Sequence, residues 1–233
     1  MIVSVHLAEL GWRRVPGVLR SQVDPAGVPG MTYAETVLGA PLRSGPLPSP
    51  GPGRAGLIAA WEDDSALDRF LADHPLARRL AAGWHVRLEP LRVFGAWPKM
   101  PGLPKRELPV DDGEPVAVLT IGKLRLGRSL PFLRASGPAE KKAAGVPGVL
   151  ASTALAHPPQ LVSTFSLWRS AAEMREYAFD KGGPHQAAVR ADRSKPFHHE
   201  SAFIRFRPYA SEGNWGGRDP LATSGPPAPS AAA

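Results

Sequence analysis

The sequence contains no cysteine. This absence excludes disulfide bonds, cysteine-ligated zinc, iron–sulfur clusters, thiolate-ligated haem and cysteine nucleophiles, so a metal would need histidine, tyrosine or carboxylate ligands. Long apolar stretches are also missing, because no run approaches the roughly 18 residues that a membrane-spanning helix requires. Residues 1–10 do not resemble a signal peptide, since they lack a basic start and His6 and Glu9 interrupt their apolar run. We therefore expect a soluble, cytoplasmic protein, for which attachment to a membrane surface stays open.

Acidic residues are outnumbered, with 28 Lys and Arg against 21 Asp and Glu and a net charge of +7. A basic chain suits nucleic acid, anionic lipid or an acidic protein as a partner. The most biased segment, Ile121–Lys142, contains six Lys and Arg residues and a single Glu. This segment lacks interleaved aromatic residues of the kind that stack on bases, so we do not expect nucleic-acid binding.

Glycine and proline are abundant, at 24 and 27 of 233 residues, and much of the excess falls in three segments. We expect residues 41–54 to be an inserted loop, 98–114 a linker and 222–233 a disordered tail. Gly51–Gly56 matches the spelling of a dinucleotide-binding glycine motif. That motif requires a strand before it and a helix after it, whereas here a proline-rich loop precedes and a strand-like run follows. The match therefore does not predict a nucleotide site.

The chain repeats itself in order. Gly27-Val-Pro-Gly30 recurs as Gly145-Val-Pro-Gly148, and each copy is followed by an apolar, strand-like run. A second such run then ends in tryptophan, at Trp61 and at Trp168. Each half closes on Gly-x-Trp, at Trp97 and Trp215. Ordered matches at similar spacing predict a duplicated structural unit.

Hydrophobic periodicity predicts the same elements in both halves. In the first half we expect strands at 1–10, 31–40, 55–61 and 84–97, a short helix within 11–27 and a helix over 65–82 that Pro75 kinks. In the second half we expect strands at 115–125, 149–156, 160–168 and 199–209, and helices at 128–144, 170–179 and 184–192. Each half is a ferredoxin-like βαββαβ unit. The predicted fold class is α+β, with tandem ferredoxin-like repeats at 1–97 and 115–221 forming an α/β barrel around a lumen.

Three motifs of the second half carry a family resemblance. Ser163-Thr-Phe-Ser-Leu-Trp168, Gly183-Pro-His-Gln-Ala-Ala-Val-Arg190 and Glu212-Gly-Asn-Trp-Gly-Gly-Arg-Asp-Pro220 resemble the spheroidene monooxygenase family. The resemblance covers most of the chain and is sharpest over 115–221. It implies an O2-dependent oxidoreductase, a monooxygenase that oxidises a carotenoid end group, with a haem cofactor and electrons from reduced ferredoxin.

His185 is the candidate metal ligand. It falls in the first turn of a predicted short helix, where the positive end of the helix dipole disfavours the imidazolium and leaves a neutral nitrogen free for iron. It also lies in one of the family motifs, so we expect it to be the axial haem ligand; the alternative is a histidine bonded to the backbone at a helix start. Arg190 follows about 140° further round that helix and is expected to pair with a haem propionate or with a carboxylate of the protein.

Four side chains are candidates for the substrate pocket: Trp61, Trp168, Phe203 and Arg205. The two tryptophans end equivalent strands, where they line a cavity or fill the core. On the last strand the alternation places Phe203, Arg205 and Arg207 on one face, which we expect to point toward the lumen or its rim. The apolar Ile204 and Phe206 are then expected under the helices.

The leading hypothesis is a monooxygenase that binds a carotenoid-like substrate between the two sheets. The basic segment Ile121–Lys142 would dock reduced ferredoxin, because charge complementarity accelerates encounter with an acidic partner. Two alternatives remain open: a cofactor-free α/β-barrel monooxygenase acting on a polyketide-like ring, and a non-catalytic barrel that binds a small molecule.

Overall fold

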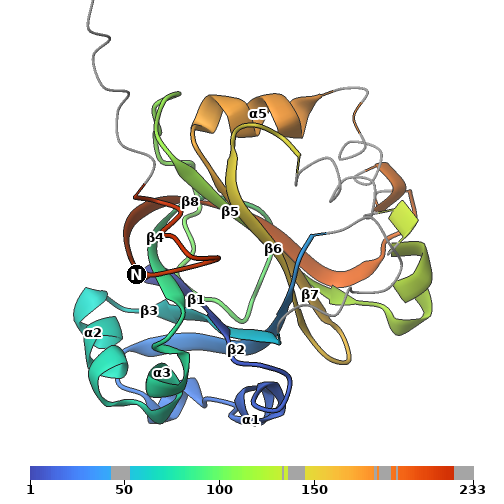
Figure 1. The fold of residues 1–233 in the computed structure, drawn as a ribbon. Coiled ribbons are helices and arrows are strands. Elements are labelled where there is room, and N and C mark those ends of the chain that lie inside the picture. Colours follow the sequence, from blue (N-terminus) through green and yellow to red (C-terminus); the bar gives the residue numbers. More distant parts are fainter. Residues whose placement is uncertain are drawn as a thin grey trace, which may run out of the picture.

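Eight antiparallel strands close into a barrel that carries helices on its outside (Figure 1). This computed structural model describes residues 1–42, 53–132, 134–135, 145–180, 183, 190–192 and 194–222. The strands of the first half are β1 (Ile2–Glu9), β2 (Met31–Ala40), β3 (Arg54–Trp61) and β4 (Trp84–Gly95). Those of the second half are β5 (Val116–Leu124), β6 (Val149–His157), β7 (Leu161–Trp168) and β8 (His198–Gly213).

The helices lie between the strands as the repeat predicts. The first half contains α1 (Val15–Arg20), the 3-10 turn η1 (Pro25–Gly27), α2 (Asp64–Asp73) and α3 (Pro75–Leu80). The second half contains the 3-10 turn η2 (Leu126–Arg128) and α5 (Ala171–Phe179), and residues 129–132, 134–135 and 190–192 are helical as well. The predicted helices at 128–144 and 184–192, and the predicted tail, fall largely outside the described residues.

The strand order confirms the tandem ferredoxin-like fold. The barrel runs β1-β3-β2-β6-β7-β5-β8-β4, so each half has the same internal order, with its first and third strands at the centre. The register repeats too, since Ile2 pairs with Trp61 and Val116 pairs with Trp168. Trp61 and Trp168 therefore occupy equivalent positions, as the sequence predicts.

Two seams join the halves into one barrel. Along the longer seam β4 pairs with β8 from Trp84 opposite Gly213 to Gly95 opposite Ala202. The β2–β6 seam is short, and His157 extends it: its Nδ1 lies 2.6 Å from the carbonyl oxygen of Thr36 and 3.0 Å from the carboxylate of Glu35. Burial raises the pKa of Glu35, although the neighbouring His157 opposes this shift.

The barrel interior is a hydrophobic core. Strand residues from both halves meet there, among them Val86 from β4, Leu119 from β5, Phe165 from β7 and Phe206 from β8. These side chains are fully buried. The lumen predicted between the sheets is therefore occupied by the protein's own side chains, and the expectation of a substrate cavity there is corrected.

The repeated Gly-x-Trp motif covers the two ends of this core. Gly95 and Gly213 end β4 and β8 with φ of +80° and +88°, a conformation that favours glycine. A Cβ on Gly213 would also lie 2.0 Å from the carbonyl oxygen of Gly83. Because β4 and β8 are antiparallel, the tryptophans that follow, Trp97 and Trp215, pack against the core at opposite ends of the barrel.

The helix predicted over 65–82 is two helices. Proline cannot donate a backbone hydrogen bond inside a helix, and the chain leaves helical geometry at His74, with ψ of 134°. The His74 Nδ1 then accepts a hydrogen bond from the Leu76 backbone N–H at 3.2 Å and caps α3. The result is a break rather than a kink, and it lets α2 and α3 both lie against the first sheet.

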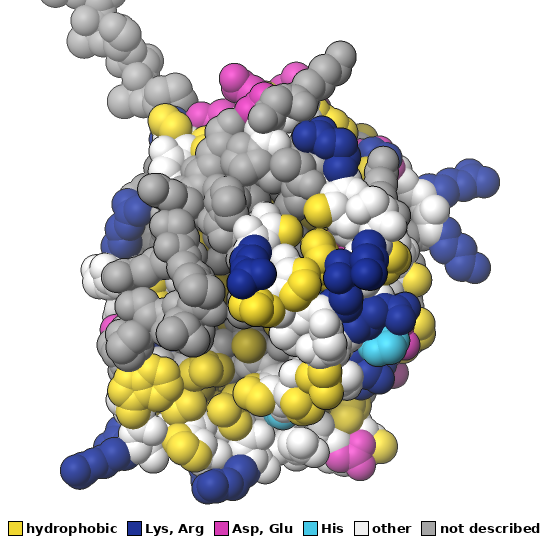
Figure 2. Space-filling view, turned by 90° about the vertical axis from the view of Figure 1, so that its right-hand side faces the viewer, with side chains coloured by type: hydrophobic (Ala, Val, Ile, Leu, Met, Phe, Trp, Pro, Cys, Tyr) yellow, Lys and Arg dark blue, Asp and Glu magenta, His cyan; other side chains and the backbone are white. Residues whose placement is uncertain are grey.

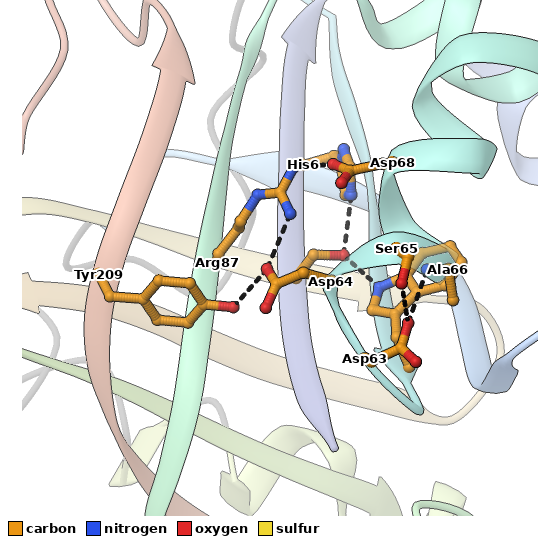
Figure 3. Close-up of polar contacts among 10 residues, drawn as sticks. His6, Asp63, Asp64, Ser65, Ala66, Asp68, Arg87 and Tyr209 are labelled. Atoms are coloured by element: carbon orange, nitrogen blue, oxygen red, sulfur yellow. Dashed lines mark hydrogen bonds and ion pairs between the residues drawn. The ribbon is translucent and has the colours of Figure 1, made fainter.

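A buried polar chain fixes the contact between α2 and the first sheet (Figure 3). The Trp61 Nε1–H donates to the Ser4 hydroxyl oxygen at 2.8 Å, and that hydroxyl lies 2.9 Å from Nε2 of His6. The His6 ring in this chain is neutral, because burial lowers its pKa. Phe70 of α2 packs on both rings.

An ion-pair cluster at the start of α2 ties the two seamed strands to that helix (Figure 3). Arg87 of β4 bonds Asp64 at 2.8 Å and also Asp68. The Tyr209 hydroxyl of β8 donates to the same Asp64 carboxylate at 2.8 Å. The helix is thus anchored across the boundary between the two halves.

We predict an acid-sensitive stability that originates at His6. Burial lowers its pKa from 6.5 to about 3, so the unfolded chain takes up a proton that the folded chain refuses. The contribution of His6 to the unfolding free energy is fully present above pH 6.5. It decreases by about 1.4 kcal/mol per pH unit as the pH falls from 6.5 toward 3. His6→Gln should reduce the slope of unfolding free energy against pH by about that amount between pH 6 and 4, measured by urea denaturation. An unchanged slope would show that other groups cause the acid loss.

Candidate functional site

The outer faces of the two sheets differ at equivalent positions. In the first sheet His6 pairs with Leu57, and the matching pair in the second sheet is Thr120 with Thr164. The next pair toward the tryptophan end is Ser4 with Ala59 in the first sheet and Val118 with Ser166 in the second. At the first of these pairs the second sheet has two threonines where the first sheet has the bulkier His6 and Leu57, whereas at the second pair both sheets have small side chains.

Burial follows this difference. His6 is 3% exposed and Leu57 is completely buried beneath the helices of the first half. In the second sheet Thr120 is exposed, while Thr164 and Ser166 are half-buried. Two half-buried residues of β6, Ser152 and Ala154, continue this surface, because Leu155 beside them faces the core. We call these outward-facing residues the second-sheet floor: Val118, Thr120, Ser152, Ala154, Thr164 and Ser166.

An aromatic wall bounds the floor at the start of β5. The rings of Trp168 and Tyr177 lie 5.2 Å apart, and Met174 of α5 packs in the same cluster. The Trp168 Nε1–H donates to the Ser166 hydroxyl oxygen at 2.9 Å. Ser170 begins α5 by accepting from the Glu173 backbone N–H at 3.2 Å, which places the helix over this end.

His198 closes the other end of the floor. A Cβ on Gly122 would lie 2.5 Å from the His198 ring, so the small residue makes room for the imidazole on the outer face of β5. Phe132 and Phe197 contact the same ring edge-on. The His198 Nδ1 lies 3.3 Å from the Asp192 carboxylate, and burial lowers the pKa of His198. The imidazole is therefore a neutral polar group at the edge of the floor.

Sequence analysis did not single out the floor or His198 as site residues. Threonine, serine and alanine are ordinary strand residues, and their meaning appears only when the register sets them against His6 and Leu57. The signal for His198 would have been Gly122 inside a strand pattern, which indicates close approach of another group.

The structure places Trp168, Phe203 and Arg205 on the outer face of the second sheet and Trp61 on that of the first. Trp61 packs against Phe70 at 5.0 Å in the sealed helix layer of the first half, so it is a core residue. Trp168 forms the aromatic wall of the floor. Phe203 packs against Phe94 of β4 at 6.0 Å, beside the longer seam. Phe203 pairs with the floor residue Thr120 across the β5–β8 ladder, so Phe203 and Trp168 both border the second-sheet floor, and Trp61 does not.

The face assignment of β8 was wrong. Ile204 and Phe206 point into the barrel core, and the opposite face, with Phe203 and Arg205, points outward. Alternation alone cannot tell the two faces apart, because both faces of a barrel strand are covered when helices or linkers pack outside it.

Arginines on this outer face bind the linker rather than a pocket. Arg205 is buried and forms an ion pair with Glu107, which also pairs with Arg92. Arg207 bonds Glu114 at 2.9 Å and Glu89 at 2.5 Å. Arg207 lowers the pKa of Glu114 through this hydrogen bond. The residues between the halves are thus held along β8 by paired charges.

The candidate haem residues are only partly visible. His185 lies outside the described residues, and Arg190 is exposed and helical. Gly183, between them and α5, is buried and donates its N–H to the Asp180 carbonyl at 2.9 Å. Within the described ranges no group of three or more His, Asp or Glu side chains is arranged to hold a metal ion. No helix in those ranges has the length and hydropathy to cross a bilayer.

Comparison with known proteins gives sequence relatives and structural neighbours. No family model matches the sequence. The chain is 34% identical over 200 residues to spheroidene monooxygenase of Rubrivivax gelatinosus, covering 82% of this chain and 74% of the relative. It is 29% identical over 174 residues to spheroidene monooxygenase of Rhodobacter capsulatus, covering 72% of this chain and 71% of the relative. An aldoxime dehydratase structure shares the fold, with a TM-score of 0.53, 12% identity and coverage of 89% and 79%.

We predict that the ion pair between Arg205 and Glu107 stabilises the folded protein. The Arg205 side chain is only 6% exposed, so removing its carboxylate leaves a buried cation without a partner. Glu107→Ala should lower the unfolding free energy by about 2 kcal/mol. Glu176→Ala, an exposed position on α5, should change it by less than about 0.5 kcal/mol. Adding Arg205→Met to Glu107→Ala should recover at least half of the loss; a double variant as unstable as Glu107→Ala would contradict the assignment.

Proposed function

Because this chain belongs to the spheroidene monooxygenase family and is therefore an oxidoreductase of the monooxygenase type, we propose that it inserts oxygen from O2 into a carotenoid or a similar apolar polyene. The difference in burial between the outer faces of the two sheets supports a location for the reaction. The second-sheet floor is partly open at positions where the first sheet is sealed by His6 and Leu57. The substrate is proposed to lie on that floor.

The floor residues suit an extended apolar molecule with one polar end. The half-buried Ala154 and the methyl groups of Thr120 and Thr164 offer apolar contact, while the buried Val118 and Trp168 form the packed end of the floor. The Ser166 hydroxyl accepts from Trp168, so its own proton is free to donate to an oxygen atom of the substrate. These side chains bind, orient and shield the polyene, and none of them is a nucleophile in this proposal.

Haem is the cofactor that the family resemblance implies, with His185 as the proposed iron ligand and Arg190 as the proposed propionate partner. The donor chemistry fits, because the chain has no cysteine and histidine is an ordinary axial ligand. When bound, the haem supplies O2 activation, while the protein supplies position and shielding from water.

The electrons for this reaction are proposed to come from reduced ferredoxin, and a cytoplasmic location stays a prediction from the sequence. Of the basic segment expected to dock the ferredoxin, Lys141 and Lys142 lie outside the described residues. Arg125, Arg128 and Arg134 are described, and Arg125 and Arg134 are exposed.

We predict that His185→Ala purifies as a folded protein without haem. Loss of the iron ligand removes the cofactor's anchor but few contacts of the barrel core. The measurement is the Soret absorbance per protein, with the far-UV circular dichroism spectrum as the check on folding. His199→Ala, at an exposed histidine of β8, is the matched control and should keep the full Soret band.

Each outcome selects one function. A full Soret band in His185→Ala would show that another residue holds the iron. A colourless wild-type protein that consumes O2 with substrate would support the cofactor-free monooxygenase instead. A colourless, inert protein would support the non-catalytic binding barrel.

We predict that filling the floor stops substrate binding without unfolding the protein. Thr164→Leu gives the second sheet the side chain that Leu57 provides at the equivalent position of the first. On an open floor this change should lower kcat/KM for the carotenoid by about tenfold or more. The unfolding free energy should change by less than about 0.5 kcal/mol. In a packed core the same change would cost about 1–3 kcal/mol.

The reciprocal variant is the control. Leu57→Thr removes buried apolar volume from the sealed face, so it should cost about 2 kcal/mol or more in stability. Its KM should match that of the wild type. Equal effects of both variants on KM and stability would refute the functional difference between the two faces.

A further inference from the structure

A basic surface with protruding leucines borders the second half of the barrel. Its cations come from the segment after β5 and from the segment before β8: Arg125, Arg128, Arg134, Arg190 and Lys195. Leu126 is 57% exposed and Leu130 is 50% exposed on the first of these segments. Figure 2 shows this side of the molecule, where Lys and Arg side chains alternate with hydrophobic ones. We call these seven residues the leucine–arginine face.

Described contacts hold the two segments together. Arg128 donates to the Lys195 carbonyl at 3.4 Å, and its guanidinium lies 5.2 Å from the centre of the Phe197 ring. The Arg125 Nε–H donates to the His198 carbonyl at 3.0 Å. Arg125 and Arg128 are therefore joined to the segment before β8, and the face is continuous with His198 at the edge of the second-sheet floor.

The charges of this face are poorly neutralised by the protein. None of its five cations takes part in an ion pair with a carboxylate among the residues that the structure describes. Asp192, the nearby acid, is directed to His198 instead. The face thus attracts an anionic partner.

The leucines decide the class of partner. An acidic protein would satisfy the cations, but two leucines that are half exposed among them remain unexplained by charge. The interface of an anionic bilayer satisfies both, since basic side chains meet lipid headgroups while leucines enter the acyl boundary. An exposed apolar patch rimmed by charge is typical of such sites.

We propose that the leucine–arginine face docks on an anionic lipid bilayer. The role of this docking in substrate delivery rests on the proposed function. Docking there brings the edge of the second-sheet floor to the bilayer, in which an apolar polyene dissolves. The substrate then passes between bilayer and floor beside His198 without crossing water.

The experiment is vesicle flotation of the full-length protein. Vesicles of phosphatidylcholine alone are compared with vesicles that contain phosphatidylglycerol, at 0.1 M and 1 M NaCl. The wild type should float with the anionic vesicles at 0.1 M and lose most of this binding at 1 M, where electrostatic screening is about threefold shorter in range. It should not float with phosphatidylcholine alone.

Two double variants test the two parts of the face. Arg134→Glu with Lys195→Glu reverses two exposed cations, and Leu126→Ser with Leu130→Ser removes both leucines without changing the charge. Each should weaken partition to anionic vesicles by about tenfold or more. The controls are Arg13→Glu with Arg14→Glu and Leu108→Ser, which alter exposed cations and an exposed leucine elsewhere. These should bind as the wild type does.

Three results would overturn the proposal: no flotation of the wild type, normal flotation of either double variant, or equal loss in the controls. If Arg134→Glu with Lys195→Glu slows only ferredoxin-driven turnover and leaves flotation unchanged, the face binds an acidic protein instead. Flotation needs no turnover, so a wild-type protein that floats but shows neither haem nor O2 consumption with substrate would keep the docking proposal and contradict only the proposed function. Restored turnover of the leucine variant on detergent-solubilised substrate, but not on vesicle-embedded substrate, would link docking to delivery.

Discussion

The constraint on which this protein depends is the closure of its two sheets into one barrel. Pairing along the β2–β6 and β4–β8 seams directs every second side chain into a shared interior. That interior is filled by residues such as Phe165 and Phe206, so it contributes stability and leaves a ligand to the outside. We therefore propose that the substrate binds outside the barrel, between sheet and helices, where each half has its own copy of the same layout.

The two copies have been put to different uses. In the first half the buried chain of Ser4, His6 and Trp61 locks α2 onto the sheet, and the cost is a histidine that must stay neutral. In the second half Thr120 and Thr164 leave the matching surface partly open. One half thus supplies rigidity for the barrel, and the other keeps a surface that a flexible apolar molecule can reach.

The repeat, the strand order and the equivalence of Trp61 with Trp168 could be predicted because local pattern and spacing determine them. The direction of the β8 side chains could not, since Phe203 and Ile204 are both apolar and only the closed barrel shows which face is inside. The break at His74 needed the cap that its side chain provides. The binding of Arg205 to Glu107 joins residues far apart in the chain, and no local signal announces it.

The linker that Arg205 and Arg207 hold against β8 has a consequence for symmetry. Two identical subunits related by a two-fold axis carry every substitution twice. A substitution that covers the outer face of one sheet would therefore also cover the equivalent face of the other sheet. A covalent connection between the halves removes that condition. It also keeps the halves at a fixed, high effective concentration, so that the seams form whatever the amount of protein in the cell. Residues 98–114 therefore do more than span a distance, because they permit asymmetry.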